Sequence, residues 1–195
     1  LDPTAAQRRA LSSHAGAARV VYNFALGCWW DWWREYHRSV TGGRPIEKPN
    51  FPELKRTFNT LRSELFPWMD GGAHRDCWSQ PFVDLHAALE NWRSGRAQRP
   101  TFKKKRSTRP SFYVANDKLR LDGRRVRLPK VGVVKMREAL RFRGKILGAH
   151  VSRDAAERWH VAIQVQGDFS RPRTGDAELG IDLGIDHAVA VSDGR

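Results

Sequence analysis

The chain has 195 residues, of which 35 are Lys or Arg and 21 are Asp or Glu, so its formal net charge is +14. A charge this far from zero makes a polyanion the expected partner, and a hydrophobic content of 40% excludes wholesale disorder. No stretch approaches the length of a membrane span, and Cys28 and Cys77 lie far apart without a CxxC motif, which excludes a disulfide scaffold or a cysteine zinc site within these residues. We expect a soluble, intracellular, basic globular protein.

Helices are predicted at the start of the chain. Thr4 and Gln7 form a capping box that begins a helix. A second amphipathic segment follows, in which apolar residues from Val20 to Cys28 recur every three to four positions before the tryptophan cluster at 29–33. The glycines and prolines of residues 42–52 then predict a linker.

Two further helices are predicted before the composition changes. The first covers Glu53 to Leu65 and ends at the following Phe-Pro pair. The second runs from about Asp76 to Trp92, with Phe82, Leu85, Leu89 and Trp92 on one face, and closes at Gly95.

After Pro100 the hydrophobic period changes from 3.6 to 2, which predicts strands. Residues 118–121 and 124–128 flank Asp122-Gly123, a typical two-residue hairpin turn. Residues 145–151 and 159–165 predict a second strand pair. After a loop at 171–175, residues 178–191 predict an apolar strand pair.

The hairpin turn also predicts a register. With Asp122-Gly123 as the loop, Arg120 faces Arg125, Lys118 faces Arg127, and Leu119 faces Val126. One face is then apolar and the other carries two opposed cation pairs, each costing about 0.2–1 kcal/mol. A phosphate backbone would remove that cost, although an ordinary exposed sheet face has the same composition.

The positive charge is concentrated in one quarter of the chain. Residues 96–145 hold 18 Lys or Arg and three acids, which gives this block a net charge of +15 and leaves the remainder near neutral. Such a block inside foldable sequence favours nucleic acid over a merely solvated surface. The cations expected to contact phosphates are Lys103, Lys104, Lys105, Arg106, Lys118, Arg120, Arg125 and Arg127. Phe102, Phe112 and Tyr113 suit base stacking or a core position.

A carboxylate stands in the middle of the last predicted strand. Asp182 lies between Gly180 and Gly184, on the face opposite the apolar residues. The glycines leave room for a phosphate to approach the carboxylate, and Mg²⁺ is the natural counter-ion for such an acid. A strand-end aspartate satisfied by backbone amides is the alternative.

Several motifs together resemble the TnpB family of nucleases, which insertion sequences encode and which are related to compact type V CRISPR effectors. Residues 178–186 with 191–194 resemble the first motif of a RuvC (RNase H-like) nuclease. The other matching segments, in the family's order, are the amino-terminal signature at 3–7 and 16–26, the PxFK segment at 99–105 and the LPKxG strand at 128–132.

The resemblance implies an α+β fold in three parts. Residues 1–95 form a helical recognition lobe, residues 96–170 a basic, wedge-like antiparallel β-barrel, and residues 171–195 the first strands of an RNase H-like RuvC domain. It also implies an RNA-guided DNA endonuclease in the prokaryotic cytoplasm, associated with the nucleoid when bound to DNA. The expected partners are guide RNA and target double-stranded DNA, without a membrane.

The resemblance assigns roles to individual residues. Asp182 matches the first catalytic acid and would ligate the Mg²⁺ ions, while Asp186 and Asp193 fall on neighbouring loop or turn positions. By position, Ser79 and Gln80 in the first turns of the helix starting near Asp76 are candidates to touch the duplex beside the target, since Gln can pair with adenine edges.

Parts of the family pattern are absent. The later RuvC acids, the CxxC-bearing zinc element and the first barrel strand are not in the sequence. We therefore expect a piece of a longer protein that does not cut alone, with any zinc site in the missing carboxy-terminal part. A guide-dependent DNA-binding protein or repressor that does not cut, and a nucleic-acid-binding protein without a guide, stay open as alternatives.

Overall fold

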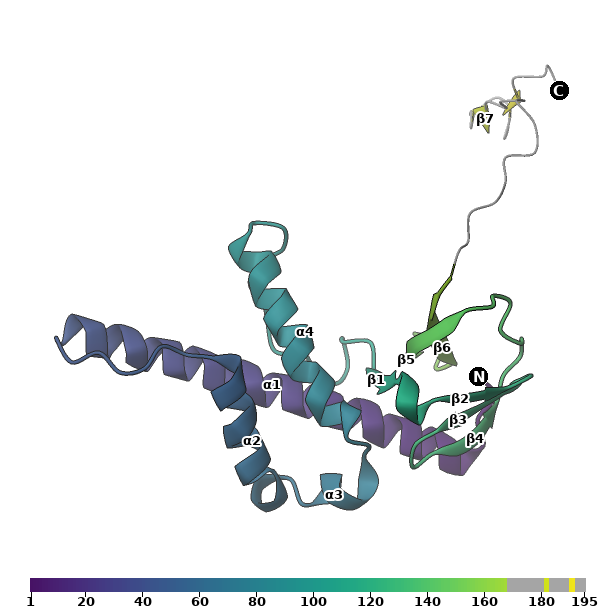
Figure 1. Cartoon of the computed structure of the whole chain (residues 1–195), viewed down its shortest axis with the longest axis horizontal. Helices are drawn as coiled ribbons and strands as arrows, with labels where there is room; N and C mark the ends of the chain where they lie inside the picture. Colours follow the sequence, from purple (N-terminus) through teal and green to yellow (C-terminus); the bar gives the residue numbers. More distant parts are fainter. Residues whose placement is uncertain (168–180, 183–189, 192–195) are drawn as a thin grey trace.

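The computed structural model describes residues 1–167, 181–182 and 190–191. The chain folds as α+β, with helices first and antiparallel sheets after them. Figure 1 shows one long helix, α1, with the other helices packed along it and the sheets gathered at its amino-terminal end. None of the helices among the described residues is both long and apolar enough to cross a membrane.

Helix α1 spans Ala5–Thr41 and is continuous, so the two amphipathic segments predicted at its start are one helix. It begins as predicted, because the Thr4 side chain accepts from the Gln7 backbone and the Gln7 side chain accepts from the Thr4 backbone. It ends at Gly42, where the predicted linker starts. The continuous helix carries one buried stripe, from Leu11 to Trp29, that can cover both the sheets and the other helices.

Three further helices pack around α1. Helix α2 spans Phe51–Leu65, two residues longer than predicted, because Asn50 caps it by accepting from the Glu53 backbone at 2.8 Å. The short α3, Trp68–Gly72, was not predicted, since one turn of helix has no readable period. Helix α4 spans Asp76–Arg93, close to its prediction.

An aromatic core holds these helices together. Phe58 of α2 is fully buried, with ring centroids 5.4 Å from Phe24 of α1 and 5.5 Å from Phe82 of α4. Edge-on and tilted contacts of this kind are favourable beyond the area that they bury. The predicted apolar face of α4 is confirmed, because Phe82, Leu85 and Leu89 are all buried.

The strands form two three-stranded antiparallel sheets. The first has the order β1-β5-β6, with β1 at Ser111–Ala115, β5 at Lys145–Arg153 and β6 at Trp159–Gln166. The second has the order β2-β3-β4, with β2 at Arg120–Asp122, β3 at Arg125–Leu128 and β4 at Gly132–Lys135. The single-turn 3-10 helix η1, Asn116–Lys118, joins β1 to β2. The predicted pairing of 145–151 with 159–165 is confirmed.

The closed β-barrel predicted from the resemblance does not occur among the described residues. The two sheets are separate and open. The first residues of the chain connect them, because Asp2 bridges to Lys135 of β4 and the backbone nitrogen of Leu1 donates to the Trp159 carbonyl of β6 at 2.8 Å. This single bridge is too short to join the sheets into one ladder.

The predicted hairpin register is wrong. Arg120 faces Arg127, Leu121 faces Val126, and Asp122 faces Arg125, so Asp122 belongs to β2 and the loop is Gly123-Arg124. Gly123 takes the left-handed conformation that the turn requires, with φ at +53°. The shift moves each partner by two residues, so the assignment of side chains to the two faces survives.

The segment that resembles the LPKxG strand is also a turn rather than one strand. Strand β3 ends at Leu128 and β4 begins at Gly132. Lys130 lies in the turn with φ at +57°, and its Nζ donates to the Asp70 carbonyl of α3 at 2.8 Å. The turn therefore joins the second sheet to the helices.

The predicted strand pair at 178–191 lies mostly outside the described residues. Within it, β7 at Ile181–Asp182 pairs antiparallel with β8 at Ala190–Val191, and Asp182 faces Ala190. The predicted loop at 171–175 lies outside the described residues as well.

Candidate nucleic-acid interface

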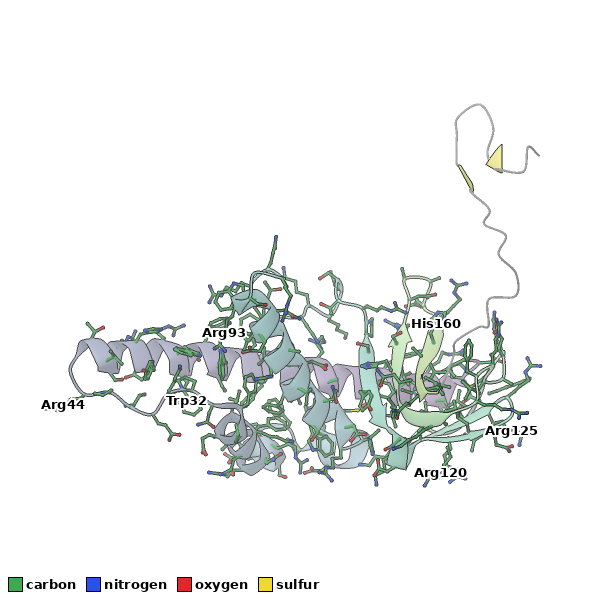
Figure 2. The ribbon with its side chains drawn as sticks, turned by 45° about the horizontal axis from the view of Figure 1, so that its top comes forward. Trp32, Arg44, Arg93, Arg120, Arg125 and His160 are labelled. Carbon is green, nitrogen blue, oxygen red and sulfur yellow. The ribbon has the colours of Figure 1, made fainter. Side chains whose placement is uncertain are left out.

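The cations of the basic block lie on two surfaces. We call the first the sheet surface and define it as the exposed face of β2-β3-β4 that carries Arg120, Arg125, Arg127 and Lys135. We call the second the basic pocket, a hollow of about 130 Å³ between α1, α4, β1, β5 and the loop before β1. In Figure 2, Arg120 and Arg125 mark the sheet surface at one end of the molecule.

Like charges face one another on the sheet surface. Arg120 of β2 lies opposite Arg127 of β3. Arg125 of β3 lies opposite Lys135 of β4. Neither of the two opposed pairs predicted within the hairpin is present, because Arg120 faces Arg127 and Arg125 faces Asp122. The exposed like-charge pairs cost stability without a counter-ion, so the face favours a polyanion.

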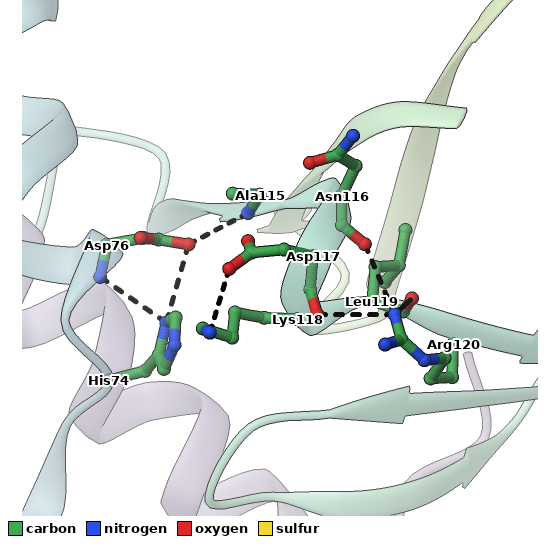
Figure 3. Close-up of polar contacts among 8 residues, drawn as sticks. All are labelled: His74, Asp76, Ala115, Asn116, Asp117, Lys118, Leu119 and Arg120. Carbon is green, nitrogen blue, oxygen red and sulfur yellow. Dashed lines mark hydrogen bonds and ion pairs between the residues drawn. The ribbon is translucent and has the colours of Figure 1, made fainter. Parts of the chain in front are cut away.

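Arg120 also forms hydrogen bonds to the backbone next to the sheet surface. Its guanidinium donates to the carbonyls of Asp117 at 3.2 Å and Leu119 at 3.0 Å (Figure 3). These bonds hold the charge beside η1 and close the end of that helix. Arg125 and Arg127, by contrast, extend from the middle of the exposed face.

Lys118 does not lie on the hairpin, contrary to the prediction. It belongs to η1, and its Nζ pairs with Asp117 at 2.8 Å (Figure 3). Its prediction as a strand residue failed because a single-turn helix interrupts the alternating pattern before β2. The Lys118 charge is therefore already partly neutralised, although the pair is exposed and weak.

The basic pocket gathers cations from distant parts of the chain. Its lining includes five basic residues, which are Arg19, Lys103, Lys105, Arg109 and Arg153, together with Tyr113 and His150. Two acids, Asp76 and Asp84, also line it. The surplus of cations and the small volume fit a phosphate group better than a whole base.

Lys103 is held in place on the wall of this pocket. Its backbone nitrogen donates to Oδ1 of Asn23 at 2.8 Å, and its carbonyl accepts from Nδ2 of Asn23 at 2.9 Å. Its Nζ lies 3.8 Å from the centroid of the Tyr22 ring, a close cation–π contact. Burial lowers the pKa of Lys103, and the Asp84 carboxylate offsets part of this effect. The charge is thus positioned before any ligand arrives.

The rest of the predicted Lys103–Arg106 run is exposed. Lys105 lines the basic pocket, whereas Lys104 and Arg106 lie in the turn beside it. The Lys104 backbone donates to Oγ1 of Thr108 at 3.0 Å, which fixes this turn. Phe102 is 55% exposed and packs near Gly27 of α1, while Phe112 is buried in the core.

Ser79 and Gln80 are half-buried in the first turns of α4, as their sequence positions indicated. Gln80 lines the basic pocket, and its Nε2 donates to Oδ1 of Asp84 at 3.0 Å. Their assignment to the duplex beside the target stays a prediction. The Gln80 amide would have to leave Asp84 in order to bind a base edge.

Polar contacts among His74, Asp76 and Ala115, which we call the polar joint, connect the start of α4 to β1 next to the basic pocket (Figure 3). Oδ2 of Asp76 accepts from the Ala115 backbone at 2.8 Å and lies 3.6 Å from Nδ1 of His74. Burial lowers the pKa of His74, and the Asp76 carboxylate partly offsets this effect. The joint fixes the end of β1 against the start of α4, and with it the two walls of the basic pocket.

Arg19, Arg109 and Arg153 were not predicted as binding residues. Arg19 lies on α1, far from the basic block in the sequence, and only the fold brings it to Lys103. One signal was available, because Ser12, Ala15, Gly16 and Ala18 precede Arg19 along α1 and all line the pocket. Small residues at helical spacing leave room for another group to approach.

The side chain of Asp182 lies outside the described part of the structure. Among the described residues, three or more His, Cys, Asp or Glu side chains nowhere lie close enough together to hold a metal ion. The Mg²⁺ site at Asp182 stays a prediction.

The sequence of the chain is similar to one family model and to a small set of curated proteins. Residues 1–38 match the OrfB/IS605 helix-turn-helix domain family, and here this stretch is largely the continuous helix α1. The whole chain is 27% identical, over 202 residues, to InsQ of Escherichia coli K12, named as a candidate RNA-guided DNA endonuclease; the match covers 100% of this chain and 46% of InsQ.

Two relatives from Mycobacterium tuberculosis, MT2953 (strain CDC 1551 / Oshkosh) and Rv2885c (strain ATCC 25618 / H37Rv), carry the same kind of name. Each is 27% identical over 225 residues, covering 99% of this chain and 47% of the relative. The chain thus spans about half the length of these relatives. The resemblance predicted from the sequence motifs is confirmed.

Proposed function

We propose that this chain is the amino-terminal part of an RNA-guided DNA endonuclease. The observation that carries the proposal is similarity along the entire chain to proteins named for that activity. The sheet surface and the basic pocket support it, because both present cations to a polyanion without a pattern that reads a particular base sequence.

In this proposal the chain's own residues bind and position nucleic acid. Arg125 and Arg127 contact the phosphates of a guide–target duplex, while Lys103 and Arg19 hold one phosphate in the basic pocket. Ser79 and Gln80, beside that pocket, approach the duplex next to the target, where a short adjacent motif is read. Contacts of this kind fix register and orientation.

The proposal assigns cleavage to a RuvC site that begins with Asp182. This carboxylate would be one of the ligands of Mg²⁺, which when bound activates water and stabilises the leaving oxygen. The remaining carboxylates, and any zinc site, would come from sequence that the curated relatives have and this chain does not span. Residues 1–195 alone are therefore expected to bind but not to cut.

RNA sequencing of the material that co-purifies with the full-length protein tests the guide. One enriched, structured RNA supports the proposal, whereas random RNA would reduce it to binding without a guide. The type of that RNA, a transposon-end transcript or a CRISPR transcript, then identifies the genetic context.

Cleavage is tested with Asp182→Ala in the full-length protein. The variant should lose Mg²⁺-dependent cutting and keep binding to the target, and Asp186→Ala should keep both. Loss of cutting in both variants would point to a general defect, and retained cutting in Asp182→Ala would remove this residue from the role. A wild-type full-length protein that binds its target without cutting would identify a nuclease-inactive targeting factor or repressor.

A further inference from the structure

A second hollow lies among the tryptophans of α1 and α4, apart from both basic surfaces. Its volume is about 460 Å³. We call it the tryptophan pocket and define it by Trp29, Trp30, Trp33 and Trp92, together with Arg34, Arg93, Arg99 and His37, which also line it. Figure 2 shows Arg93 beside the carboxy-terminal half of α1, far from Arg120 and Arg125.

The walls of the tryptophan pocket are π surfaces covered by guanidinium groups. The ring of Trp30 meets Trp92 edge-on at 5.6 Å, and the Arg99 guanidinium lies 4.2 Å from the Trp30 centroid. The Arg93 guanidinium lies 5.7 Å from Trp29 and 5.9 Å from Trp33. Three of the four tryptophans, Trp30, Trp33 and Trp92, are only partly buried.

Two indole donors of this pocket have no acceptor. Nε1 of Trp29 and Nε1 of Trp33 are both buried without a hydrogen-bond partner among the described residues, and the Trp29 side chain is only 3% exposed. Buried indole N–H groups normally find an acceptor. Both nitrogens are covered by protein atoms, so a ligand in the pocket contacts the indole rings rather than these donors.

The charge of the tryptophan pocket indicates which class of ligand it can bind. Among the described residues that line it, three are arginines and none is acidic. Arg34 pairs with Asp31 and Arg93 pairs with Glu90, each at 3.0 Å. Both pairs are exposed and contribute little free energy, so a phosphate can replace either carboxylate at small cost. A ligand with an aromatic face and a negative charge fits this lining.

We propose that the tryptophan pocket binds one unpaired nucleotide of a single strand. Its base stacks on the indole and guanidinium surfaces, and its phosphate pairs with the arginines at the rim. The site is separate from the sheet surface and the basic pocket, and it does not require that the protein cut DNA.

The test compares two short labelled single strands of equal length, a homopyrimidine and its abasic analogue, by fluorescence anisotropy with residues 1–195 at fixed salt. Base stacking is worth about 1–3 kcal/mol, so the wild type should bind the base-containing strand about 5- to 150-fold more tightly than the abasic one. Trp92→Leu should remove this preference and leave abasic binding nearly unchanged.

Three further variants keep the test decisive. Trp92→Phe keeps an aromatic face and should retain most of the preference for the base-containing strand. Arg99 is exposed, so Arg99→Gln should fold normally and weaken the same preference, and it replaces Trp92→Leu in the test if that variant does not fold. Arg125→Gln on the sheet surface should weaken both strands equally. A wild type without base preference, or a Trp92→Leu protein that retains it, overturns the proposal.

The same strands are made with deoxyribose and with ribose. The version that binds with the higher affinity shows whether the nucleotide in the pocket comes from displaced DNA or from RNA. Equal loss on base-containing, abasic and duplex ligands in a folded Trp92→Leu protein would show that the pocket does not recognise the base, and this result would also overturn the proposal. None of these outcomes depends on whether one structured RNA co-purifies with the full-length protein.

Discussion

Asn23 in the middle of α1 and Lys103 in the loop before β1 form a reciprocal pair, in which one amide side chain both donates to and accepts from a single backbone residue. The two residues are 80 positions apart in the sequence. This pair fixes the start of the basic loop against the longest helix, and it places the Lys103 charge over Tyr22.

The first prediction is that Asn23→Ala destabilises the protein. The change leaves a partly buried backbone donor and acceptor of Lys103 without partners, which should lower the free energy of unfolding by about 1–3 kcal/mol. Urea denaturation measures this loss. Asn59→Ala on the exposed face of α2 is the control and should shift stability by no more than about 0.5 kcal/mol. Equal effects at the two positions would refute the structural role of Asn23.

A large part of this architecture could be predicted from the sequence. The capping box at Thr4, the linker, the apolar face of α4 and the pairing of β5 with β6 all follow from local pattern. The assignment of side chains to the two faces of the hairpin was also right, because a shift of two residues preserves the alternation of side chains.

What could not be predicted depends on contacts between distant segments. The register expected from an Asp-Gly turn was wrong, because Asp122 pairs with Arg125 and leaves Gly123-Arg124 as the loop. The basic pocket needs Arg19 and Arg153, which only the packing of α1 against β1 and β5 brings to the loop at 103–109. No local pattern contains that information.

The second prediction concerns Gly148 of β5. The Tyr113 side chain crosses directly over this glycine and donates from its hydroxyl to the Leu147 carbonyl at 3.1 Å, so a Cβ at position 148 would overlap the ring. Gly148→Ala should lower the free energy of unfolding by about 1–3 kcal/mol, because neither backbone nor ring can move freely.

A matched control comes from α1. A Cβ at Gly16 meets no atom within 4 Å, so Gly16→Ala should stabilise the protein by about 0.5–1 kcal/mol through helix propensity. In a Tyr113→Ala background the cost of Gly148→Ala should fall, and the remainder should reflect the positive φ of residue 148, which is +158°. If the cost did not fall at all there, the overlap with Tyr113 would not contribute to it.

The third prediction is a trade-off on the sheet surface. Arg127→Thr removes the like charge opposite Arg120, which should raise the free energy of unfolding by a few tenths of a kcal/mol at low salt. The same change should weaken binding to duplex nucleic acid and reduce the slope of log affinity against log salt by about 1. Thermal unfolding and salt-titrated anisotropy measure the two effects.

Arg125→Thr serves as the comparison for this trade-off. Arg125 faces both Asp122 and Lys135, so its loss should leave stability nearly unchanged while reducing the salt slope to the same extent. A stability gain at Arg125 equal to that at Arg127 would contradict the observed register.

The fourth prediction is a loss of stability in mild acid that depends on His14. The side chain of His14 is 1% exposed, and its Nδ1 contacts the Ala10 carbonyl at 2.7 Å. Burial lowers the pKa of His14 in the folded protein, the nearby positive groups His74 and Lys130 lower it further, and the carbonyls of Ala10 and Pro129 only partly offset these effects.

The direction of the effect follows from proton linkage. Because the folded pKa lies below the ordinary value of 6.5, the unfolded chain binds the proton more readily, so stability is complete above that pH and is lost as the pH falls below it. The slope should approach about 1.4 kcal/mol per pH unit for this histidine. His14→Leu should flatten the profile of unfolding free energy between pH 7.5 and 5. A profile that stays as steep without His14 would assign the acid sensitivity to another group, such as His74, whose pKa burial also lowers.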